Sequence, residues 1–367
     1  MKNKKLFIFS AITIILIIVA GIASRMHAPQ VKREKELLLP ELALRINDIA
    51  EITIKGNKRN VDLKKQNESW VIGNADNYPA VFEKVKDTVI SLSALKIVAE
   101  KTDNPELYSE LEVEGPDNPD SRSLLLTLKD ATGQTISSII IGAQKHSKAT
   151  GVKPGLYVRR PQEKQALLVE GSFYITDQVT DWLNQNIIDI PSSAIQEVRI
   201  THPDGDQLIM NKDAREDPEF NLQGDIKQEK SVFKIILNRI STALEEVRAD
   251  GVVSADTFEF SDNATITVFK TFEGIIVTVK SEIIDEKPYA HISVTYDSTI
   301  TTEQSADIEN EAQILNSVLS DWVYQIPDFK YEDLTKKLEN ITTGGAAGGE
   351  EKNVQPGNSL DGLNFSQ

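Results

Sequence analysis

Residues 49–54 read IAEITI, and residues 195–200 read IQEVRI. In both stretches apolar and polar residues alternate, as they do in a strand that buries one face and exposes the other. The two stretches open two longer segments whose later features also correspond, which indicates an internal repeat. The sequence therefore predicts two copies of one structural unit.

A turn and a second short strand follow each of these stretches. Gly56-Asn57 precedes residues 61–64 in the first copy, and Pro203-Asp204-Gly205 precedes residues 207–210 in the second. Glycine, proline, asparagine and aspartate are the residues that tight turns favour. Each pair of strands therefore reads as a hairpin.

An amphipathic helix is predicted in each copy, after a short aromatic-bearing strand at residues 70–72 or 220–222. Pro79 suits the opening turn of the first helix, because the amide proton that proline lacks would have no partner there. A spacing of four, four and three residues places the apolar residues of each helix on one face. These residues are Val81, Val85, Val89 and Leu92 in the first helix and Val232, Ile236, Ile240 and Ala243 in the second.

Each copy continues with alternating segments and ends with a predicted closing helix. The alternating segments are residues 124–129, 135–141, 156–160 and 166–169 in the first copy and 265–269, 275–279 and 292–296 in the second. The closing helices are expected at residues 173–184, with Asp181-Trp182-Leu183, and at residues 303–324, with Asp321-Trp322-Val323. This order predicts an α+β fold of largely antiparallel sheets covered by helices, in two repeats at residues 45–191 and 192–339.

The N-terminal residues predict an exported protein. Residues 1–5 are basic, and residues 6–23 carry no charge and span about 27 Å as a helix, close to the thickness of a hydrocarbon core. This pattern favours a single-pass anchor in the bacterial inner membrane with the body on the extracytoplasmic side. A cleaved signal peptide stays open as the alternative, because Gly21-Ile22-Ala23 places small residues where a signal peptidase cleaves. Residues 24–44 read as a juxtamembrane linker, and the glycine-rich residues 340–367 read as a flexible tail.

Composition argues against several classes of protein. The formal net charge of −16 argues against nucleic-acid binding, which needs clustered lysine and arginine. The chain has no cysteine, which removes disulfide bonds, thiolate metal sites and a cysteine nucleophile. It also has no G-x-x-x-x-G-K-[ST] motif, so any link to transport would make it an accessory subunit rather than the motor.

No residue belongs to a recognisable catalytic or metal-binding motif. Ser172 follows Gly171 without the G-x-S-x-G elbow of a hydrolase and reads as a helix N-cap. The histidines lack the H-E-x-x-H spacing of a zinc site, and surface positions are expected for them. They are His27, His146, His202 and His291. We therefore expect no catalytic, cofactor-binding or metal-binding residues and no cofactor.

Three further groups of residues have a structural and a functional interpretation. The aspartates Asp117, Asp120, Asp204 and Asp206 lack the spacing of a calcium loop, and turns explain them better. Trp182 and Trp322 are expected to anchor the cores, with a ligand platform as the alternative. A basic stretch is either a solvated loop or a contact for an anionic surface such as lipid headgroups. It contains Lys145, Lys148, Lys153, Arg159 and Arg160.

Several motifs of the first copy, in their order along the chain, resemble one known family. They are Trp70-Val71, Tyr78-Pro79-Ala80, Lys101-Thr102 with Pro105, Tyr108 and Leu111, Tyr157-Val158-Arg159, and Asp181-Trp182-Leu183. The chain resembles a domain of unknown function, family 4340, of membrane-anchored bacterial proteins. This resemblance implies an envelope location and work beside components of ABC transporters or gliding-motility auxiliary proteins, and it supplies no catalytic residues.

We therefore expect a non-catalytic accessory or scaffold subunit rather than an enzyme. Its expected partners are the inner membrane and a membrane protein such as transporter components, and nucleic acid is not expected. Two alternatives stay open. One is a protein that binds an envelope polysaccharide or a small ligand in a cleft between the repeats. The other is a hydrolase whose motif the sequence does not disclose.

Overall fold

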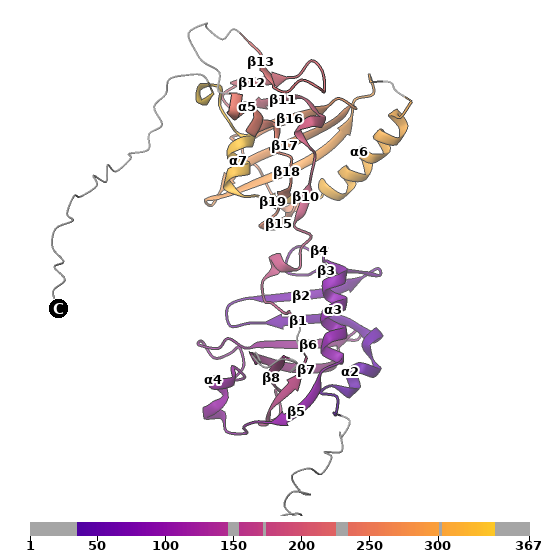
Figure 1. The fold of residues 1–367 in the computed structure, drawn as a ribbon, viewed down its shortest axis with the longest axis vertical. Helices are drawn as coiled ribbons and strands as arrows, with labels where there is room; N and C mark the ends of the chain where they lie inside the picture. The colour runs from indigo at the N-terminus through magenta and orange to yellow at the C-terminus, as the bar shows by residue number, and fades with distance from the viewer. Residues whose placement is uncertain (1–34, 146–153, 172–173, 225–233, 301–302, 342–367) are drawn as a thin grey trace, which may run out of the picture. The chain divides into compact units, whose positions relative to one another are not determined.

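The computed structural model describes residues 35–145, 154–171, 174–224, 234–300 and 303–341 (Figure 1). Both of its large sheets are antiparallel and are accompanied by a few helices, so the predicted α+β class is confirmed. The predicted membrane helix at residues 6–23 lies outside the described residues. Within the described ranges, no helix combines the length and the apolar composition that a membrane crossing needs.

The described residues form two compact units. The first takes its residues from Met1–Lys65 and Phe82–Asp177, and the second from Gln66–Val81 and Gln178–Gln367. The boundary therefore differs from the predicted one near residue 191, because two segments of the first predicted repeat pack with the second unit. In one of these packings, the amide of Ser254 donates to a carboxylate oxygen of Asp76 at 2.9 Å.

The first unit is built on an antiparallel sheet in the order β2-β1-β6-β7-β8-β9-β5. In chain order these strands are β1 (Ile49–Lys55), β2 (Asn60–Gln66), β5 (Lys96–Glu100), β6 (Leu124–Asp130), β7 (Thr135–Lys145), β8 (Gly155–Arg159) and β9 (Ala166–Glu170). The helices are α2 (Pro40–Leu44), α3 (Phe82–Ser93) and α4 (Tyr108–Leu111), with short 3₁₀ turns at Ile46–Asp48 and Pro105–Leu107. Helix α3 crosses one face of the sheet (Figure 1).

Helix α3 buries the predicted apolar stripe except at its start. Val85, Val89 and Leu92 are buried, whereas Val81 precedes the helix and Pro79 lies in the short strand β4 (Tyr78–Pro79). The helix therefore begins three residues after Pro79, and proline is not in its opening turn.

Part of the predicted juxtamembrane linker belongs to the first unit. Leu38 and Leu42 are buried completely, and Leu37 forms a β-bridge with Lys96. The amide of Leu38 donates to the carbonyl of Leu95 at 2.8 Å. Burial of these leucines explains why residues 37–44 pack rather than behave as a linker.

The second unit is built on an antiparallel sheet in the order β13-β12-β11-β16-β17-β18-β19-β15. Its strands are β11 (Ile195–Thr201), β12 (Gln207–Asn211), β13 (Asn221–Leu222), β15 (Gly251–Ser254), β16 (Thr265–Thr271), β17 (Ile275–Ile284), β18 (Lys287–Tyr296) and β19 (Trp322–Gln325). Outside this sheet lie the short strands β3 (Ser69–Ile72) and β4, and the pair β10 (Asn186–Ile188) and β14 (Val247–Arg248). The helices are α5 (Lys234–Ser241), α6 (Ser305–Leu319) and α7 (Asp328–Leu334), with 3₁₀ turns at Val179–Asp181, Ser192–Ala194, Ala255–Thr257 and Leu338–Asn340.

The two sheets have equivalent strand orders, and both have a shift of register near the start of one strand. The order β2-β1-β6-β7-β8-β9-β5 has its counterpart in β12-β11-β16-β17-β18-β19-β15. In both β1 and β11 the register shifts after the first isoleucine, between Ile49 and Glu51 and between Ile195 and Glu197. Such a bulge inserts one residue, so a strand can bury Ile49 and Ile52 although they are three positions apart. Duplication of one unit stays a prediction.

The first predicted closing helix is wrong, and the second is confirmed except at its C-terminal end. In the described part of residues 173–184, only Val179–Asp181 forms a 3₁₀ turn. The second helix, α6, ends at Leu319, and Trp322 lies in strand β19 between β18 and β15. Aromatic and β-branched residues favour strands, and the extended backbone of β19 supplies hydrogen bonds to both neighbouring strands. Ile341, which was expected in the tail, is completely buried, and residues 342–367 lie outside the described residues.

The lowered pKa of one carboxylate in the first unit, that of Asp130, leads us to expect that stability depends on pH. Asp130 accepts hydrogen bonds from the hydroxyl of Thr132, from Arg45 and from the amides of Thr132 and Gln134, and these bonds lower its pKa to about 2. A carboxyl whose pKa is lowered by folding stabilises the fold above its ordinary pKa of about 4, and this contribution is lost as the pH falls towards 2.

The Asp130→Asn variant should therefore lose stability at pH 6 and show a flatter fall in stability between pH of about 4 and 2. Urea unfolding of the full chain across this range measures the change. Asp117→Asn is a matched control, since Asp117 is an exposed carboxylate that pairs with Lys55. Parallel pH curves for wild type and Asp130→Asn would contradict the assignment.

Candidate functional site

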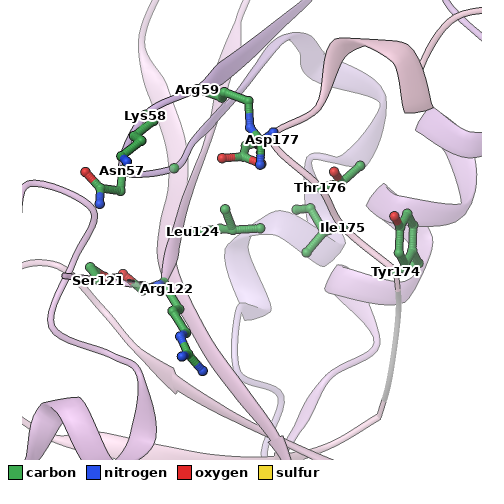
Figure 2. Close-up of a pocket in the computed structure, with 12 residues that line it drawn as sticks. Asn57, Lys58, Arg59, Ser121, Arg122, Leu124, Tyr174, Ile175, Thr176 and Asp177 are labelled. Atoms are coloured by element: carbon green, nitrogen blue, oxygen red, sulfur yellow. Dashed lines mark hydrogen bonds and ion pairs between the residues drawn. The ribbon is translucent and has the colours of Figure 1, made fainter. Parts of the chain in front are cut away.

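A pocket with a volume of about 620 Å³ lies in the first unit. Three segments line it: the loop between β1 and β2, residues 121–124 at the start of β6, and residues 174–177 after β9 (Figure 2). Ligand pockets typically measure about 300 to 1,000 Å³. We therefore consider this pocket the candidate site.

One wall of the pocket depends on a glycine. Gly56 directly follows β1, and its amide donates to the carbonyl of Arg59 at 2.8 Å, which closes the loop. A Cβ atom at Gly56 would lie 2.0 Å from Oδ2 of Asp177, so only glycine leaves room for this carboxylate. Oδ1 of Asp177 in turn lies 3.5 Å from Nε of Arg59. The glycine thus allows Asp177 to hold the Arg59 side chain at the rim.

Buried hydroxyl groups shape the opposite wall. The hydroxyls of Ser121 and Ser123 lie 2.7 Å apart, and the Ser123 hydroxyl accepts from the amide of Gly115 at 3.1 Å. Between the two serines, the exposed Arg122 reaches outward, and its Nη1 lies 3.6 Å from a carboxylate oxygen of Glu112. The hydrogen bonds of the serines therefore fix the backbone on both sides of Arg122.

Apolar side chains form the middle of the pocket. In the view of Figure 2, Leu124 lies between the Arg59–Asp177 pair and Arg122, and Ile175 lies between Leu124 and Tyr174. Tyr174 stands beside them with 73% of its surface exposed. The pocket thus combines an apolar floor and an aromatic ring with cationic side chains, in a chain whose net charge is −16.

The sequence did not point to this pocket. Gly56-Asn57 was identified only as a turn, and the other lining residues formed no motif. The three segments are separated by more than 40 residues each, so only the pairing of β1 with β6 and the path of the chain after β9 bring them together.

The two described histidines have structural surroundings. His202 is buried, which makes its expected surface position wrong, and its ring nitrogens face the carbonyl of Lys336 at 3.4 Å and the hydroxyl of Thr265 at 3.5 Å. It is buried because the segment after α7 covers the end of β11. His291 is half-buried, with Nε2 2.8 Å from the carbonyl of Ser320. His27, His146 and Ser172 lie outside the described residues.

The candidate aspartates have roles in turns and ion pairs. Asp204 accepts from the amide of Asp206 at 3.1 Å and pairs with Lys337 at 2.8 Å. The bond from Lys337 is the main cause that lowers the pKa of Asp204. Asp117 pairs with Lys55 at 2.7 Å, and the amide of Asp120 donates to the side chain of Asn118. In the described part of the chain, no three acidic or histidine side chains are grouped as metal ligands.

The basic stretch divides between surface and interior. Arg159 is 8% exposed and donates to backbone carbonyls, so a solvated loop is the wrong description of this residue. Arg160 donates to the carbonyl of Leu38 at 2.7 Å and to Glu163 at 3.0 Å. Lys145 is exposed at the end of β7. Lys148 and Lys153 lie outside the described residues.

The two tryptophans differ in their surroundings. Trp182 is 3% exposed, which suits the expected core anchor. Trp322 is half-buried, and its ring meets that of Tyr78 edge-to-face with centroids 4.9 Å apart. Both residues lie in the second unit, so they do not anchor one core each.

Buried charges beneath α7 fix this helix in the second unit. The ammonium of Lys330 donates to the carbonyls of Thr242 at 3.0 Å and Glu245 at 2.5 Å, next to the end of α5. Burial lowers the pKa of Lys330 and raises the pKa of Asp333, whose carboxylate pairs with Arg239 at 2.8 Å. Perturbed pKa values can mark active sites. Here the groups join two helices, which is a structural role.

Comparison with known proteins identifies a family without an assigned activity. Neither the curated proteins nor the solved structures give a significant match to this chain. The model of one family, described as Domain of unknown function (DUF4340), matches residues 70–265. The match covers more than half of the 367 residues and includes the predicted motifs Trp70-Val71, Tyr157-Val158-Arg159 and Asp181-Trp182-Leu183. The chain therefore belongs to the DUF4340 family of domains of unknown function.

Proposed function

We propose that this protein is a non-catalytic accessory or scaffold subunit on the extracytoplasmic face of the bacterial inner membrane. In this proposal residues 6–23 anchor it, and the body contacts a membrane protein such as a component of an ABC transporter. The uncharged run at residues 6–23, which follows a basic start, supports this location. The observation that carries the contact role is an apolar pair on the outer face of α6.

Helix α6 is fixed to the sheet by one face only. Ala312 and Leu319 are buried, and the side chain of Asn316 accepts from the amide of Val294 in β18 at 2.9 Å. Ile314 and Val318 are 56% and 59% exposed. At 3.6 residues per turn they point away from the buried residues and lie one turn apart on the helix surface.

Acidic residues continue this outer face. Asp307, Glu311, Ile314 and Val318 follow each other at spacings of four, three and four residues, so they form one stripe, which we name the α6 stripe. An apolar pair next to two carboxylates suits a protein partner that offers an apolar surface beside lysine or arginine. We therefore assign the α6 stripe to a basic, partly apolar surface of the membrane partner.

The test compares stripe and control variants of the full chain, expressed at matched levels and purified from membranes in mild detergent after crosslinking. Sequencing of the N-terminus shows whether residues 6–23 remain attached. The Ile314→Gln/Val318→Gln variant should reduce recovery of one identified membrane protein by about tenfold, since loss of about 1.4 kcal/mol in a contact has this effect.

The control is Ile235→Gln, the same change at an isoleucine of α5 that is 78% exposed. It should recover the partner as wild type does, and all variants should unfold at the same urea concentration. Equal recovery by the stripe and control variants would contradict the role of the stripe. A mature N-terminus at Ser24 would contradict the anchor.

A further inference from the structure

The second unit has a position equivalent to the pocket of the first unit, but side chains and backbone of the second unit fill it. Register defines the equivalent residues: Ile54 of β1 lies opposite Leu126 of β6, and Ile200 of β11 lies opposite Thr267 of β16. The residue that directly follows the strand is Gly56 in the first unit. In the second unit it is His202.

In the second unit this position is covered by the chain itself. The ring of His202 lies against Thr265 and the carbonyl of Lys336, and the hydroxyl of Thr267 donates to the carbonyl of Leu334 at 2.5 Å. In the first unit, glycine replaces the imidazole, and Leu124 takes the place of Thr265 at the start of the strand. Residues 174–177 there border the pocket instead of filling it. The pocket thus results from particular residues of the first unit.

The rim of the pocket suits an anionic group. Lys58 and Arg122 are exposed at the rim, and Arg59 is held there by Asp177. Guanidinium groups bind carboxylates through paired, charge-assisted hydrogen bonds. The nearest carboxylate oxygens within the protein are 3.5 Å from Nε of Arg59, in Asp177, and 3.6 Å from Nη1 of Arg122, in Glu112. A ligand carboxylate at the usual distance of about 2.7 to 2.9 Å would bind the guanidinium groups more closely.

The floor requires that the ligand also has an apolar face. Leu124 and Ile175 offer hydrocarbon, and Tyr174 offers an exposed ring. The carbon–hydrogen face of a pyranose ring packs on such surfaces, while planar amide and carboxylate groups, here Asn57 and Asp177, hydrogen-bond to its hydroxyls. An inorganic anion would use only the rim.

We infer that this pocket binds a saccharide that carries a carboxylate, such as a uronic acid unit of a polysaccharide. The site lies within the first unit and is separate from the α6 stripe, so it does not rest on the scaffold role. The volume of about 620 Å³ leaves room for more than one sugar ring.

The experiment titrates the purified full chain with a trimer of galacturonic acid by isothermal calorimetry at low ionic strength. The methyl ester of the same trimer is the matched neutral probe, and sodium phosphate is the probe for an anion alone. The acid trimer should bind at least about tenfold more tightly than its ester or phosphate, because hydrogen bonds to charged groups contribute more than neutral ones.

Two variants locate the binding. Arg122→Gln and Tyr174→Ala should each weaken binding of the acid trimer by about tenfold without changing urea unfolding, since both side chains are exposed. Arg248→Gln, at an exposed arginine of the second unit, should leave binding unchanged. The inference is overturned if the trimer does not bind, if ester or phosphate binds as tightly, or if the pocket variants behave like Arg248→Gln.

Discussion

Replacement of Trp182 by alanine is expected to lower the free energy of unfolding by about 3 to 5 kcal/mol, which is the usual cost of truncating a buried tryptophan. The side chain is 3% exposed, and the backbone of residues 182 and 183 also forms contacts. The carbonyl of Trp182 accepts from the amide of Val81, and Leu183 forms a β-bridge with Ala80. The ring therefore lies in the core where residues 80 and 81 pair with residues 182 and 183.

Urea unfolding of the full chain, followed by circular dichroism, measures this loss. Trp182→Phe keeps an aromatic ring and should cost clearly less than the alanine variant. Trp322→Ala is the comparison at a half-buried tryptophan, and it should also cost less because less apolar surface is lost. If Trp182→Ala and Trp322→Ala cost the same, burial of Trp182 does not determine its contribution.

A domain holds together with about 5 to 15 kcal/mol, so the Trp182→Ala loss is a large share of the total. We therefore expect lower cellular abundance of this variant, and a loss of function through abundance rather than chemistry. Comparison of function at matched abundance separates these effects.

The sequence predicted the strands well because their signal is local. The alternation at residues 52–54 and 198–200 matches the inward residues of β1 and β11. The bulges after Ile49 and Ile195 were not predicted, because a bulge depends on the pairing with β6 or β16 rather than on composition.

The second closing helix ends earlier than predicted, because pairing of strands decides the structure of its last predicted residues. Trp322-Val323-Tyr324 could extend the apolar stripe of α6, yet in β19 these residues pair with β15 and β18. Pairing with β15 and β18 stabilises Trp322-Val323-Tyr324 as a strand, and this outweighs the weak preference of these residues for a helix. The pocket was missed for a related reason: Gly56, Arg122 and Tyr174 become neighbours only through the path of the folded chain.

The buried guanidinium of Arg159 shows how misleading a charge pattern can be. Arg159 ends β8 in a basic stretch, yet its side chain turns inward. Nε donates to the carbonyl of Val113 at 2.9 Å, Nη1 to that of Glu163 at 3.1 Å, and Nη2 to that of Glu114 at 3.3 Å. Its guanidinium carbon lies 4.6 Å from the centre of the Tyr108 ring. One cation thus joins β8 to the loops on either side.

The Arg159→Met variant keeps most of the apolar volume but removes every donor. Carbonyls of Val113, Glu114 and Glu163 would then lose this donor, and the carbonyl of the buried Val113 would lose it away from solvent. Hydrogen bonds to charged groups contribute about 1.5 to 3 kcal/mol each and do not add fully, so we expect a loss of about 3 to 5 kcal/mol in the free energy of unfolding.

Arg159→Lys provides the sharper comparison, because it keeps the positive charge and loses the planar fork of donors. A lysine ammonium cannot reach three carbonyls in the directions that the guanidinium serves, so this variant should lose nearly as much stability as Arg159→Met. Arg160→Met is the matched control at the next residue, whose side chain is more exposed, and it should cost about 1 kcal/mol. Urea unfolding of the three variants decides between charge and geometry: full stability of Arg159→Lys would mean that the charge alone holds these loops.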